Sequence, residues 1–324
     1  MIKAGIIGGS GYTGGELIRI LLNHPSATID FVFSTTRAGK PISSAHPDLL
    51  GTTDMDFTGK VNPEVDVVFL CLGHGNSTKF LKSNSFSRTT KIIDLSNDFR
   101  LREDSILDGK PFVYGLPELN KEAIQKASYI ANPGCFATAI QLALLPLAKA
   151  GHLENEVHIN AVTGSTGAGV SPSGTTHFSW RNNNVSWYKP FTHQHLAEIK
   201  QSITSLQDET GELFFLPNRG NFTRGILATV YTRFEESEDK AIQLFQDFYS
   251  EAEFTQITSA PIHLKQVVNT NQCHIHLHKH NDTLLMTSAI DNLLKGASGQ
   301  AVQNMNLMFG IAQSEGLKLK AGVY

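Results

Sequence analysis

Apolar residues in the first third of the chain form short, nearly continuous runs, separated by stretches with helical spacing. The runs predict strands at 3–8, 29–34, 65–72 and 91–95, and residues 14–23 have the spacing of an amphipathic helix. Residues 65–72 are apolar at almost every position, which is typical of a central strand in a parallel sheet. This alternation predicts βαβ units and therefore a Rossmann-type, doubly wound parallel sheet.

The pattern changes in the second half of the chain. Alternating or β-branched runs predict strands at 157–163, 225–234, 273–280 and 283–290, with helices between them at 196–206 and 239–249. These elements indicate an α+β domain with a mostly antiparallel sheet. A final helical stretch at 298–313 has no partner that the pattern alone identifies, and it can pack on either domain.

Length and charge narrow the class of protein. A chain of 324 residues is long enough for two domains that each have their own core. The formal net charge of −3 gives no electrostatic reason to expect nucleic-acid binding. No apolar run approaches the roughly 20 residues of a membrane span. The chain enters a strand almost at once, so we expect no signal peptide, and three scattered cysteines predict a reducing cytoplasm.

A glycine-rich turn joins the first predicted strand to the first predicted helix. It consists of Gly8, Gly9, Ser10, Gly11, Tyr12, Thr13 and Gly14. Glycine allows a tight turn and lets the backbone approach a pyrophosphate at the helix N-terminus. Because the motif lies between a strand and a helix, we interpret it as a dinucleotide-binding turn rather than a purely structural one.

The end of the second strand bears on the choice of nicotinamide cofactor. An enzyme that uses NAD usually carries an acid there, but Asp30 stands near the beginning of this strand. The strand is followed by Ser34, Thr36, Arg37 and Lys40, whose hydroxyls and positive charges suit a 2′-phosphate. The sequence therefore favours NADP, and an ordinary polar loop is the alternative.

Cys135 is the candidate nucleophile. It follows Asn132-Pro133-Gly134 and precedes a long helical pattern that runs to Lys149, so we expect the thiol at a helix N-terminus. The positive end of the helix dipole favours a thiolate at such a position. A nicotinamide site together with an activated cysteine suggests hydride transfer to or from a thioester.

Two histidines offer a proton donor for this thiolate. His193 and His195 stand with Glu198 at the beginning of a predicted helix, and histidine suits acid–base catalysis near neutral pH. Spacing alone does not distinguish catalysis from a surface histidine at a helix cap. Four further histidines alternate with Cys273, Ile275 and Leu277 along 273–280; we interpret them as a polar strand face at a subunit interface and predict no metal site.

Several segments together resemble a known family. They are Gly9-Ser-Gly-Tyr-Thr-Gly-Gly15, Asp94-Leu-Ser-Asn-Asp-Phe-Arg-Leu101, Tyr114-Gly-Leu-Pro-Glu118, Asn132-Pro-Gly-Cys135, His193-Gln-His195, Thr223-Arg-Gly-Ile226 and Asp291-Asn-Leu-Leu-Lys-Gly-Ala-Ser-Gly-Gln300. In this order, through essentially the whole chain, they resemble the N-acetyl-γ-glutamyl-phosphate reductases, within the superfamily of aspartate-semialdehyde dehydrogenase. The resemblance implies reduction of an N-acyl-glutamyl 5-phosphate to its semialdehyde with NADPH, in arginine biosynthesis.

The resemblance also implies residue roles. Cys135 matches the family nucleophile and His195 matches the acid–base histidine, with His193 as the less favoured choice and a substrate ligand. The glycine turn matches the NADP pyrophosphate loop, and 34–37 the adenosine-phosphate loop. Further implied ligands are Asn292 for the nicotinamide, Arg100 for the acyl phosphate and Arg224 for a carboxylate.

The resemblance divides the chain into a cofactor domain at 1–134, a catalytic and dimerisation domain at 135–297, and a C-terminal helix at 298–324 that returns to the first domain. It implies a homo-oligomer, a dimer or a tetramer, acting on a small acyl phosphate. Gln194 stands where the family often has arginine, which leaves the N-acyl group open. The alternatives are a dehydrogenase for aspartyl phosphate or a carrier-linked acyl phosphate, and a redox-sensing NADP-binding regulator.

Overall fold

The computed structural model describes residues 1–323, which fold as two compact units. The first unit comprises 1–133 and 297–318, and the second comprises 134–296 with the segment from Leu319 onward. The first unit therefore consists of two segments, of which the first ends at Pro133 and the second begins at Ala297.

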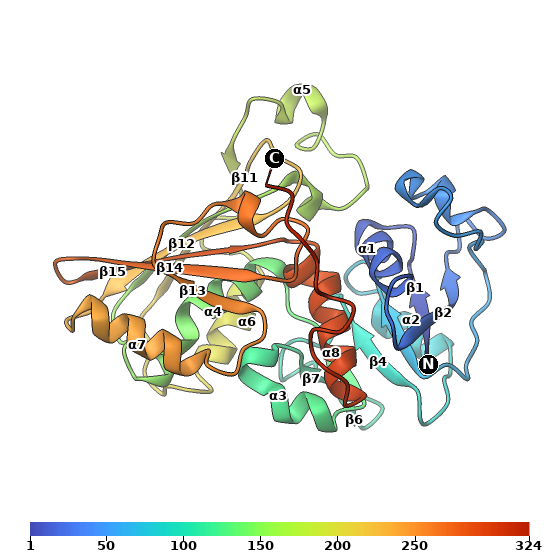
Figure 1. Ribbon diagram of the computed structural model, residues 1–324, viewed down its shortest axis with the longest axis horizontal. Helices are drawn as coiled ribbons and strands as arrows, with labels where there is room; N and C mark the ends of the chain where they lie inside the picture. Colours follow the sequence, from blue (N-terminus) through green and yellow to red (C-terminus); the bar gives the residue numbers. More distant parts are fainter. Residues whose placement is uncertain (324) are drawn as a thin grey trace. The chain divides into compact units, whose positions relative to one another are not determined.

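The first unit is built on a six-stranded sheet in the order β2-β1-β3-β4-β8-β7, with every neighbouring pair parallel (Figure 1). Its strands are β1 (Ile2–Ile7), β2 (Ala27–Phe33), β3 (Val67–Leu70), β4 (Lys91–Asp94), β7 (Val113–Tyr114) and β8 (Tyr129–Ala131). All four residues of β3 are buried, as expected for a central strand covered on both faces.

Helices cover both faces of this sheet. They are α1 (Tyr12–Leu21), α2 (Ser77–Ser83), α3 (Pro117–Lys126) and α8 (Gly299–Met308). The last helix, α8, contacts α1, α3 and β4. Phe80 and Leu81 of α2 pack against a core cluster that includes Ile7 of β1, Val68 of β3 and Ile92 of β4. The unit also contains a small hairpin, β5 (Ile106–Leu107) and β6 (Lys110–Pro111), and two 3-10 helices, Ile42–Ser44 and Pro47–Leu49.

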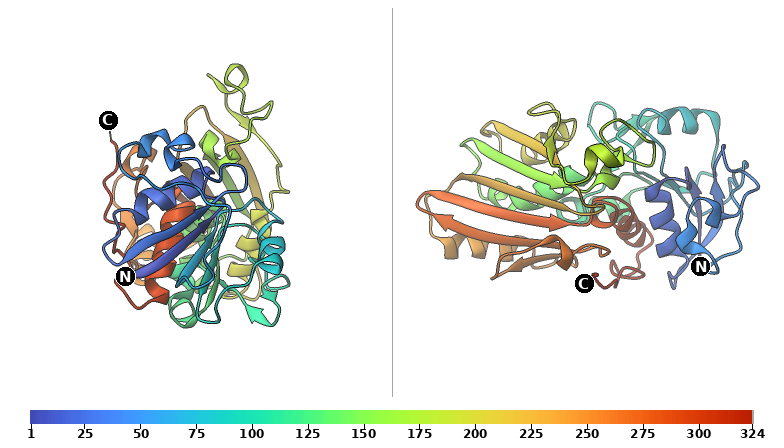
Figure 2. Two further views of the ribbon diagram at one scale, coloured as in Figure 1. Left: turned by 90° about the vertical axis from the view of Figure 1, so that its right-hand side faces the viewer. Right: turned by 90° about the horizontal axis from the view of Figure 1, so that it is seen from above.

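The second unit contains a seven-stranded mixed sheet in the order β10-β11-β9-β12-β15-β14-β13. Its strands are β9 (Val157–Thr163), β10 (Ser186–Trp187), β11 (Leu213–Arg219), β12 (Ile226–Arg233), β13 (Thr255–Thr258), β14 (Cys273–His280) and β15 (Thr283–Ile290). Only the β11–β9 and β13–β14 pairs are parallel. The right-hand view of Figure 2 shows these strands side by side.

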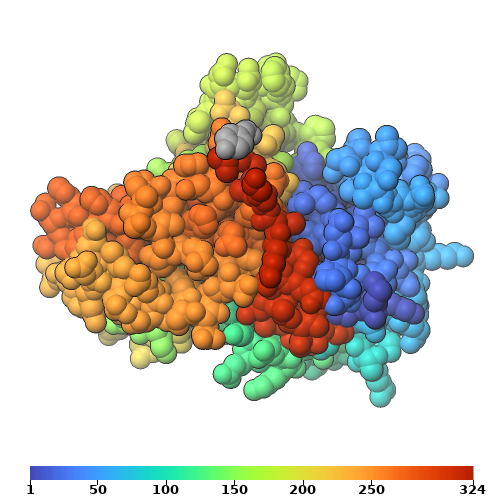
Figure 3. All heavy atoms as spheres, in the orientation of Figure 1, coloured from blue at the N-terminus to red at the C-terminus, as the bar shows by residue number. Residues whose placement is uncertain are grey.

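Helices of the second unit pack on one face of this sheet. They are α4 (Cys135–Lys149), α6 (His195–Ile203) and α7 (Glu238–Phe248). The short helix α5 (Phe178–Arg181) lies apart from this layer, in the loop between β9 and β10 (Figure 1). The unit also contains 3-10 helices at Ser165–Ala168 and Leu264–Gln266 and a π-helix at Leu294–Ser298. The helix α4 contacts β12, β15, α6 and α7, and its residues 136–148 are buried. In Figure 3 the orange surface of this unit is formed by α7 and by the segments of β13 to β15.

The helices α4, α6 and α7 lie on one face of the mixed sheet and leave its opposite face uncovered. Along β14 the buried residues are Cys273, Ile275 and Leu277, whereas the four histidines alternate with them and point to the other face. The same alternation runs through β9, β12 and β15. One face of the sheet is therefore the core face, and the other is available to solvent or to a partner.

The predicted fold class is confirmed: a Rossmann-type parallel sheet accompanies an α+β unit whose sheet is mostly antiparallel. The predicted strands at 157–163, 273–280 and 283–290 have the observed bounds. The final helix ends at Met308 rather than at residue 313. The pattern does not predict β11, because its apolar run does not alternate and contains Pro217, which argues against a central strand.

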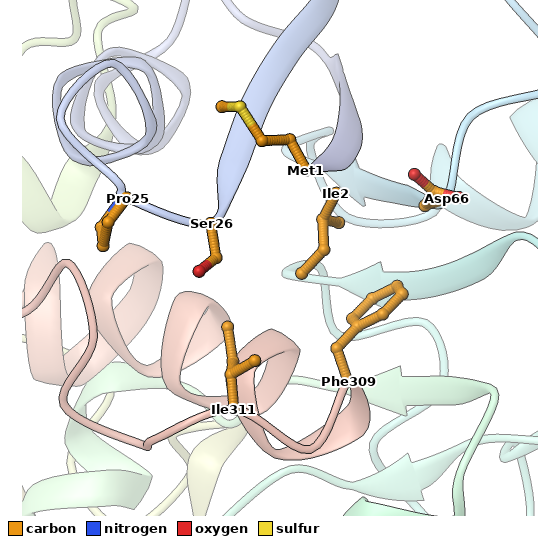
Figure 4. A pocket seen from close by; sticks show the side chains of 7 residues that line it. All are labelled: Met1, Ile2, Pro25, Ser26, Asp66, Phe309 and Ile311. Atoms are coloured by element: carbon orange, nitrogen blue, oxygen red, sulfur yellow. The ribbon is translucent and has the colours of Figure 1, made fainter.

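A surface hollow of about 470 Å³ lies in the first unit (Figure 4). It is lined by Met1, Ile2, Pro25, Ser26, Asp66, Phe309 and Ile311. Met1 and Ile2 mark the beginning of β1, whereas dinucleotides bind at the carboxyl ends of parallel strands. The hollow is therefore at the wrong edge of the sheet for the cofactor.

Candidate functional site: a glycine turn and a cysteine at a helix N-terminus

The glycine turn closes tightly between β1 and α1. Gly8 has a φ of +78°, and a Cβ atom on it would lie 2.6 Å from the carbonyl oxygen of Cys71. A Cβ on Gly14 would lie 2.6 Å from Cα of Gly9. Packing within the protein therefore explains why these two positions are glycine.

Gly11 is glycine for a different reason. The nearest atom to a Cβ built there is 3.8 Å away, so a side chain would project into open space. Gly11 is also the N-cap of α1, and no side chain caps this helix. Amide groups at such an end favour an anion, and the missing side chain leaves room for it. This geometry fits a pyrophosphate.

The other predicted cofactor residues lie around this turn. Ser34, buried at the end of β2, donates a hydrogen bond of 3.4 Å to Oγ of Ser10. Beyond it Thr36 is exposed, and Nη1 of Arg37 donates to the carbonyl oxygen of Ser44 at 2.9 Å. Asp30 lies in the middle of β2 rather than at its end. The donors beside the turn thus suit a phosphate better than a ribose hydroxyl.

Tyr12 and Thr13 form the first turn of α1. The Tyr12 side chain is 40% exposed, and the backbone oxygen of Thr13 accepts a hydrogen bond of 2.8 Å from Ser298. Sequence reasoning missed His46, whose Nε2 lies 2.7 Å from the carbonyl oxygen of Gly9. Nothing local marks this histidine, because its role depends on a contact between distant segments.

Arg100 is buried and bound to backbone carbonyls. Its Nε donates to the oxygen of Asn132 at 2.8 Å, and its Nη2 donates to the oxygen of Leu95 at 2.9 Å. Asn132 precedes Cys135 by three residues, so Arg100 helps to shape the segment that leads to the nucleophile. Its predicted contact with the acyl phosphate remains a prediction.

Asp94 anchors the segment that contains Arg100. It is fully buried and accepts hydrogen bonds from Ser77 at 2.5 Å and from Ser96 at 2.7 Å. Burial raises the pKa of Asp94 to about 6, against the effect of these hydrogen bonds and of the Arg100 charge. The carboxyl group therefore holds the end of β4 in place.

Cys135 is the first residue of α4. The sequence predicts this position, because it places the thiol at a helix N-terminus. Gly134 is the N-cap, with extended backbone, and no side chain caps the helix. Gly296 packs directly against the cysteine, since a Cβ on Gly296 would lie 2.7 Å from Cβ of Cys135. The thiol thus lies at the positive end of a buried helix and against bare backbone.

Glu198 links the cysteine segment to His195. One carboxylate oxygen of Glu198 accepts a hydrogen bond of 3.0 Å from the amide of Gly134, and the other lies 3.9 Å from Nε2 of His195. Both side chains are buried. The carboxylate therefore holds the N-terminus of α4 and the predicted acid–base histidine in one network.

His193 is held in a neutral form. Its Nδ1 accepts a hydrogen bond of 3.2 Å from the amide of His195, and the two rings lie 4.6 Å apart. Burial, followed by the charge of His195, lowers the pKa of His193 to about 3. Its ring also contacts Phe136 and Phe215. Near neutral pH this histidine is therefore an uncharged part of an aromatic wall.

Two residues of this wall were missed in the sequence analysis. Tyr188 lies 5.7 Å from His193, and the guanidinium of Arg219 lies 4.7 Å from the Tyr188 ring centroid. Burial raises the pKa of Tyr188 to about 12, and the charge of Cys135 acts in the same direction. Tyr188 follows the segment between Trp180 and Trp187, whose aromatic residues were the only local signal.

Arg224 and Asn292 gather around Asp291 in the second unit. Nε of Arg224 lies 3.1 Å from the carboxylate of Asp291, which is fully buried. The side-chain oxygen of Asn292 accepts from the amide of Gly225 at 2.7 Å, and its nitrogen donates to Thr166 at 3.0 Å. Both side chains brace the loop before β12; their predicted ligand contacts remain predictions.

The remaining cysteines and histidines form no further reactive centre among residues 1–323. None of the three cysteines forms a disulfide in the described part of the chain, and burial raises the pKa of Cys71 to about 12. In the described part of the chain no group of three histidine, cysteine or acidic side chains is arranged to hold a metal ion. None of the helices described here has the length and apolar character that a membrane span requires.

Comparison with family models assigns both halves of the chain. Residues 3–127 match the family "Semialdehyde dehydrogenase, NAD binding domain", and residues 135–292 match "Semialdehyde dehydrogenase, dimerisation domain". The boundary between these matches falls just before Cys135. The glycine turn thus lies in the first match, and the cysteine with both histidines lies in the second.

Curated relatives match over full length. The N-acetyl-gamma-glutamyl-phosphate reductase of Flavobacterium johnsoniae is 63% identical over 99% of this chain and 99% of its own. That of Christiangramia forsetii is 61% identical over 100% of both chains. Among solved structures, aspartate semialdehyde dehydrogenase II of Vibrio cholerae in complex with ASA aligns with a TM-score of 0.70 at 17% identity, covering 96% of this chain and 98% of its own. The Candida albicans enzyme with NADP gives 0.69 at 16%, covering 95% and 98%.

Proposed function

Because this chain belongs to the N-acetyl-gamma-glutamyl-phosphate reductase family, we propose that it reduces an N-acyl-glutamyl 5-phosphate with NADPH through a thioester on Cys135. The products are the N-acyl-glutamate 5-semialdehyde and inorganic phosphate, and the chain is an oxidoreductase of arginine biosynthesis. The observation that carries the residue roles is the network of Gly134, Glu198 and His195 at the N-terminus of α4.

The reaction begins at the thiol of Cys135. The thiolate attacks the acyl-phosphate carbonyl, and the N–H groups in the first turn of α4 are the nearest donors for the tetrahedral oxyanion. Loss of phosphate leaves the acyl group on sulfur, which divides one difficult reduction into two easier steps. When bound, the cofactor supplies the hydride that reduces this thioester.

His195 handles the proton in both steps. A base near Cys135 must keep the thiol deprotonated, and the same group must protonate the hemiacetal oxygen and accept that proton as the thiolate leaves. Glu198 is close enough to orient the His195 ring and to stabilise its charged form. His193 is less suited to this task, because its pKa is lowered to about 3 and its Nδ1 accepts an amide hydrogen bond.

Replacing the two histidines tests this assignment. We expect His195→Asn to lower turnover by orders of magnitude and to abolish the neutral-pH limb of the rate profile. His193→Asn should act mainly on KM for the semialdehyde. The assay is NADP reduction that depends on phosphate, with N-acetyl and bulkier N-acyl glutamate semialdehydes as substrates. If His193→Asn shows the larger loss of turnover and His195→Asn the smaller, the assignment moves to His193.

A dinucleotide is bound by the first unit, and we propose that it is NADP. The open space at Gly11 and the uncapped N-terminus of α1 suit a pyrophosphate, and Ser10, Ser34 and Arg37 suit a 2′-phosphate. The relevant measurement is the ratio of kcat/KM for NADP and NAD. A ratio near one would contradict the proposal.

We further propose that the free face of the mixed sheet joins a second copy of the chain. Aromatic rings line this face: His158 stacks on Phe214 at 5.2 Å and on Tyr231 at 5.0 Å, and Tyr231 is 42% exposed. A hollow of about 280 Å³ lies beside them. The matched family model is a dimerisation domain, which supports this surface as the interface.

Sedimentation velocity tests the interface. Wild-type protein should sediment as a dimer or a larger oligomer, and Tyr231→Glu should shift it toward the monomer because a charge would then be buried between apolar rings. Lys200→Gln, on the exposed side of α6, changes the net charge by the same one unit and should leave the mass unchanged. An unchanged oligomer with Tyr231→Glu would place the interface elsewhere.

We also propose that the enzyme works in the cytoplasm. Its mechanism requires Cys135 as a thiol, and within residues 1–323 no disulfide joins any of the three cysteines. A reducing compartment keeps such a thiol available. Fractionation of the native cell, followed by detection of the protein in each fraction, checks this location.

A further inference from the structure

Arg219 is the last residue of β11, and it lies in the second unit with Cys135. Alternation along the strand places its side chain on the same face as Phe215, which contacts Phe136 at 5.3 Å and His193 at 5.5 Å. Its guanidinium lies 4.7 Å from the ring centroid of Tyr188. The arginine therefore extends the aromatic wall beside the nucleophile.

The backbone of Arg219 is fixed on two sides. It pairs with Thr163 in β9 and with Ser186 in β10. Its carbonyl oxygen also accepts a hydrogen bond of 2.5 Å from the buried side chain of Arg181. A side chain on such a backbone loses little entropy when it binds a ligand, because its starting point is already ordered.

The positive charge of Arg219 is not neutralised within the protein. No carboxylate among residues 1–323 forms an ion pair with it, and its Nε is buried without a hydrogen-bond partner. The neighbouring Tyr188 accepts a hydrogen bond from Arg219 but stays uncharged, because burial raises its pKa to about 12. A buried donor without a partner is costly, so a ligand that accepts from it gains affinity.

The other arginines of this unit that lie near ligand-binding loops differ in this respect. Arg224 is paired with Asp291, and Arg181 donates to the backbone oxygens of Thr175, Asn184 and Arg219. Among residues 1–323, the Nε of Arg219 is the only arginine nitrogen that is buried without a hydrogen bond. Lys189, whose charge also acts on His193, donates to the side chain of Gln194. Among the arginines of this unit described here, Arg219 is therefore the one that offers a buried donor to an anion.

We propose that Arg219 binds a carboxylate of the acyl-phosphate substrate and thereby selects acidic N-acyl amino acids. The inference rests on the proposed function, since it takes the thioester on Cys135 as given. A planar guanidinium pairs with a carboxylate through two parallel hydrogen bonds, and one fixed positive charge balances one carboxylate. A phosphoryl dianion needs more donors than this single side chain offers.

The test compares substrates that differ in one charge. The phosphate-dependent oxidation of N-acetyl-glutamate semialdehyde is measured beside that of its α-carboxamide and of a semialdehyde whose N-acyl group carries its own carboxylate. Arg219→Met keeps the aliphatic stem on Tyr188 and removes the charge, and Arg219→Lys restores a charge without the planar fork. Arg233→Met is the matched control, because Arg233 is exposed at the end of β12 and pairs with Glu235.

Arg219→Met should raise KM for the carboxylate substrate roughly ten- to a hundred-fold, with a smaller effect on kcat and on KM for phosphate. The carboxamide should bind equally poorly to wild type and variant. If Arg219→Met abolishes the preference for N-acetyl-glutamate semialdehyde over its α-carboxamide, Arg219 binds the α-carboxylate. If it abolishes only the preference for the substrate with an acidic N-acyl group, Arg219 binds the carboxylate of that group. Calorimetry of N-acetyl-glutamate with Cys135→Ser and with Cys135→Ser/Arg219→Met gives the same comparison without turnover.

Other outcomes overturn the inference. A variant that raises KM for the carboxylate and the carboxamide equally would mean that Arg219 only supports Tyr188, and a rise in KM for phosphate would mean that it binds the leaving group. The proposed function fails separately, if wild type oxidises none of the N-acyl-glutamate semialdehydes in the presence of phosphate and NADP.

Discussion

Gly296 gives the sharpest test of how tightly the nucleophile is positioned. It lies in the π-helix Leu294–Ser298 and presents bare backbone to Cys135. A methyl group at this position would lie 2.7 Å from Cβ and 3.1 Å from Cα of Cys135. Gly296→Ala therefore acts on the geometry of the thiol without changing any group that takes part in the chemistry.

The size of the effect follows from these distances. Ordinary contact between such carbons begins near 3.4 Å, so the two backbones must move apart by roughly 0.7 Å or more. A displacement of about 1 Å at a reacting atom costs on the order of a hundred-fold in rate. We therefore expect Gly296→Ala to lower kcat/KM by about ten- to a hundred-fold, which corresponds to roughly 1.4–2.7 kcal/mol of transition-state stabilisation.

Two measurements check this expectation. The first is phosphate-dependent NADP reduction with N-acetyl-glutamate semialdehyde. The second is the rate of Cys135 alkylation by iodoacetamide, which reports on the thiol without a substrate. Cys273 should react slowly because it is fully buried, and Cys71 because its pKa is raised. Gly174→Ala is the control, since no atom lies within 4 Å of a Cβ at that position.

Gly296→Ala should remain folded and keep its affinity for the cofactor, with a urea midpoint lower than that of Gly174→Ala because the added methyl group overpacks this contact. If a folded Gly296→Ala protein retains wild-type kcat/KM and a wild-type alkylation rate, the contact does not position the thiol, and the reasoning from backbone packing is refuted.

Three further predictions concern the thiol, the cofactor and pH. Cys135→Ser should bind NADPH normally and lose reduction almost completely, and mass spectrometry of wild type with acyl phosphate alone should find the adduct on Cys135. Arg37→Ala should raise KM for NADPH roughly ten- to a hundred-fold and leave KM for NADH nearly unchanged, whereas exposed Lys60→Ala should affect neither. The pKa of His193 is lowered from 6.5 to about 3, so the unfolded state takes up a proton that the folded state refuses, and stability falls as pH drops below about 6.5. Urea titrations at pH 6.5 and 4.5 give the loss in free energy of unfolding between these two pH values. This loss should be about 2–3 kcal/mol smaller for His193→Gln than for wild type, and equal losses would contradict the cause assigned to the pKa shift.

Strand positions followed from the sequence where one face of a strand is buried. In β14 and β15 polar and apolar residues alternate, because one face of each strand contacts α4 or α7 while the other does not, and β9 shows the same alternation. The period of two is a local property, so it can be read without the fold. The strand β11 was missed because its apolar run contains Pro217. The run forms a strand because it pairs with β9 and β10, which come from other parts of the chain.

The positions of Cys135 and of the glycine turn relative to their helices also followed from the sequence. Each depends on residues that are neighbours in the chain: Gly8 to Gly14 lie between a strand and a helix, and Cys135 begins a helix. Spacing alone does not distinguish the two histidines, because both lie within three residues, and the preference for His195 came from the family resemblance. Both are buried, and they differ in their partners: Nδ1 of His193 accepts a hydrogen bond from the amide of His195, whereas Nε2 of His195 lies 3.9 Å from Glu198.

The residues that sequence reasoning missed owe their roles to tertiary contacts. His46 reaches the glycine turn from another segment, and Arg219 meets Tyr188 because β10 pairs with the end of β11. No local pattern distinguishes Arg219 from the exposed Arg233, since both close a strand. Composition and periodicity determine which elements form and which residues carry chemistry, because these are properties of neighbouring residues. The register between strands decides which charges lose water and remain without a partner, and that depends on residues far apart in the chain.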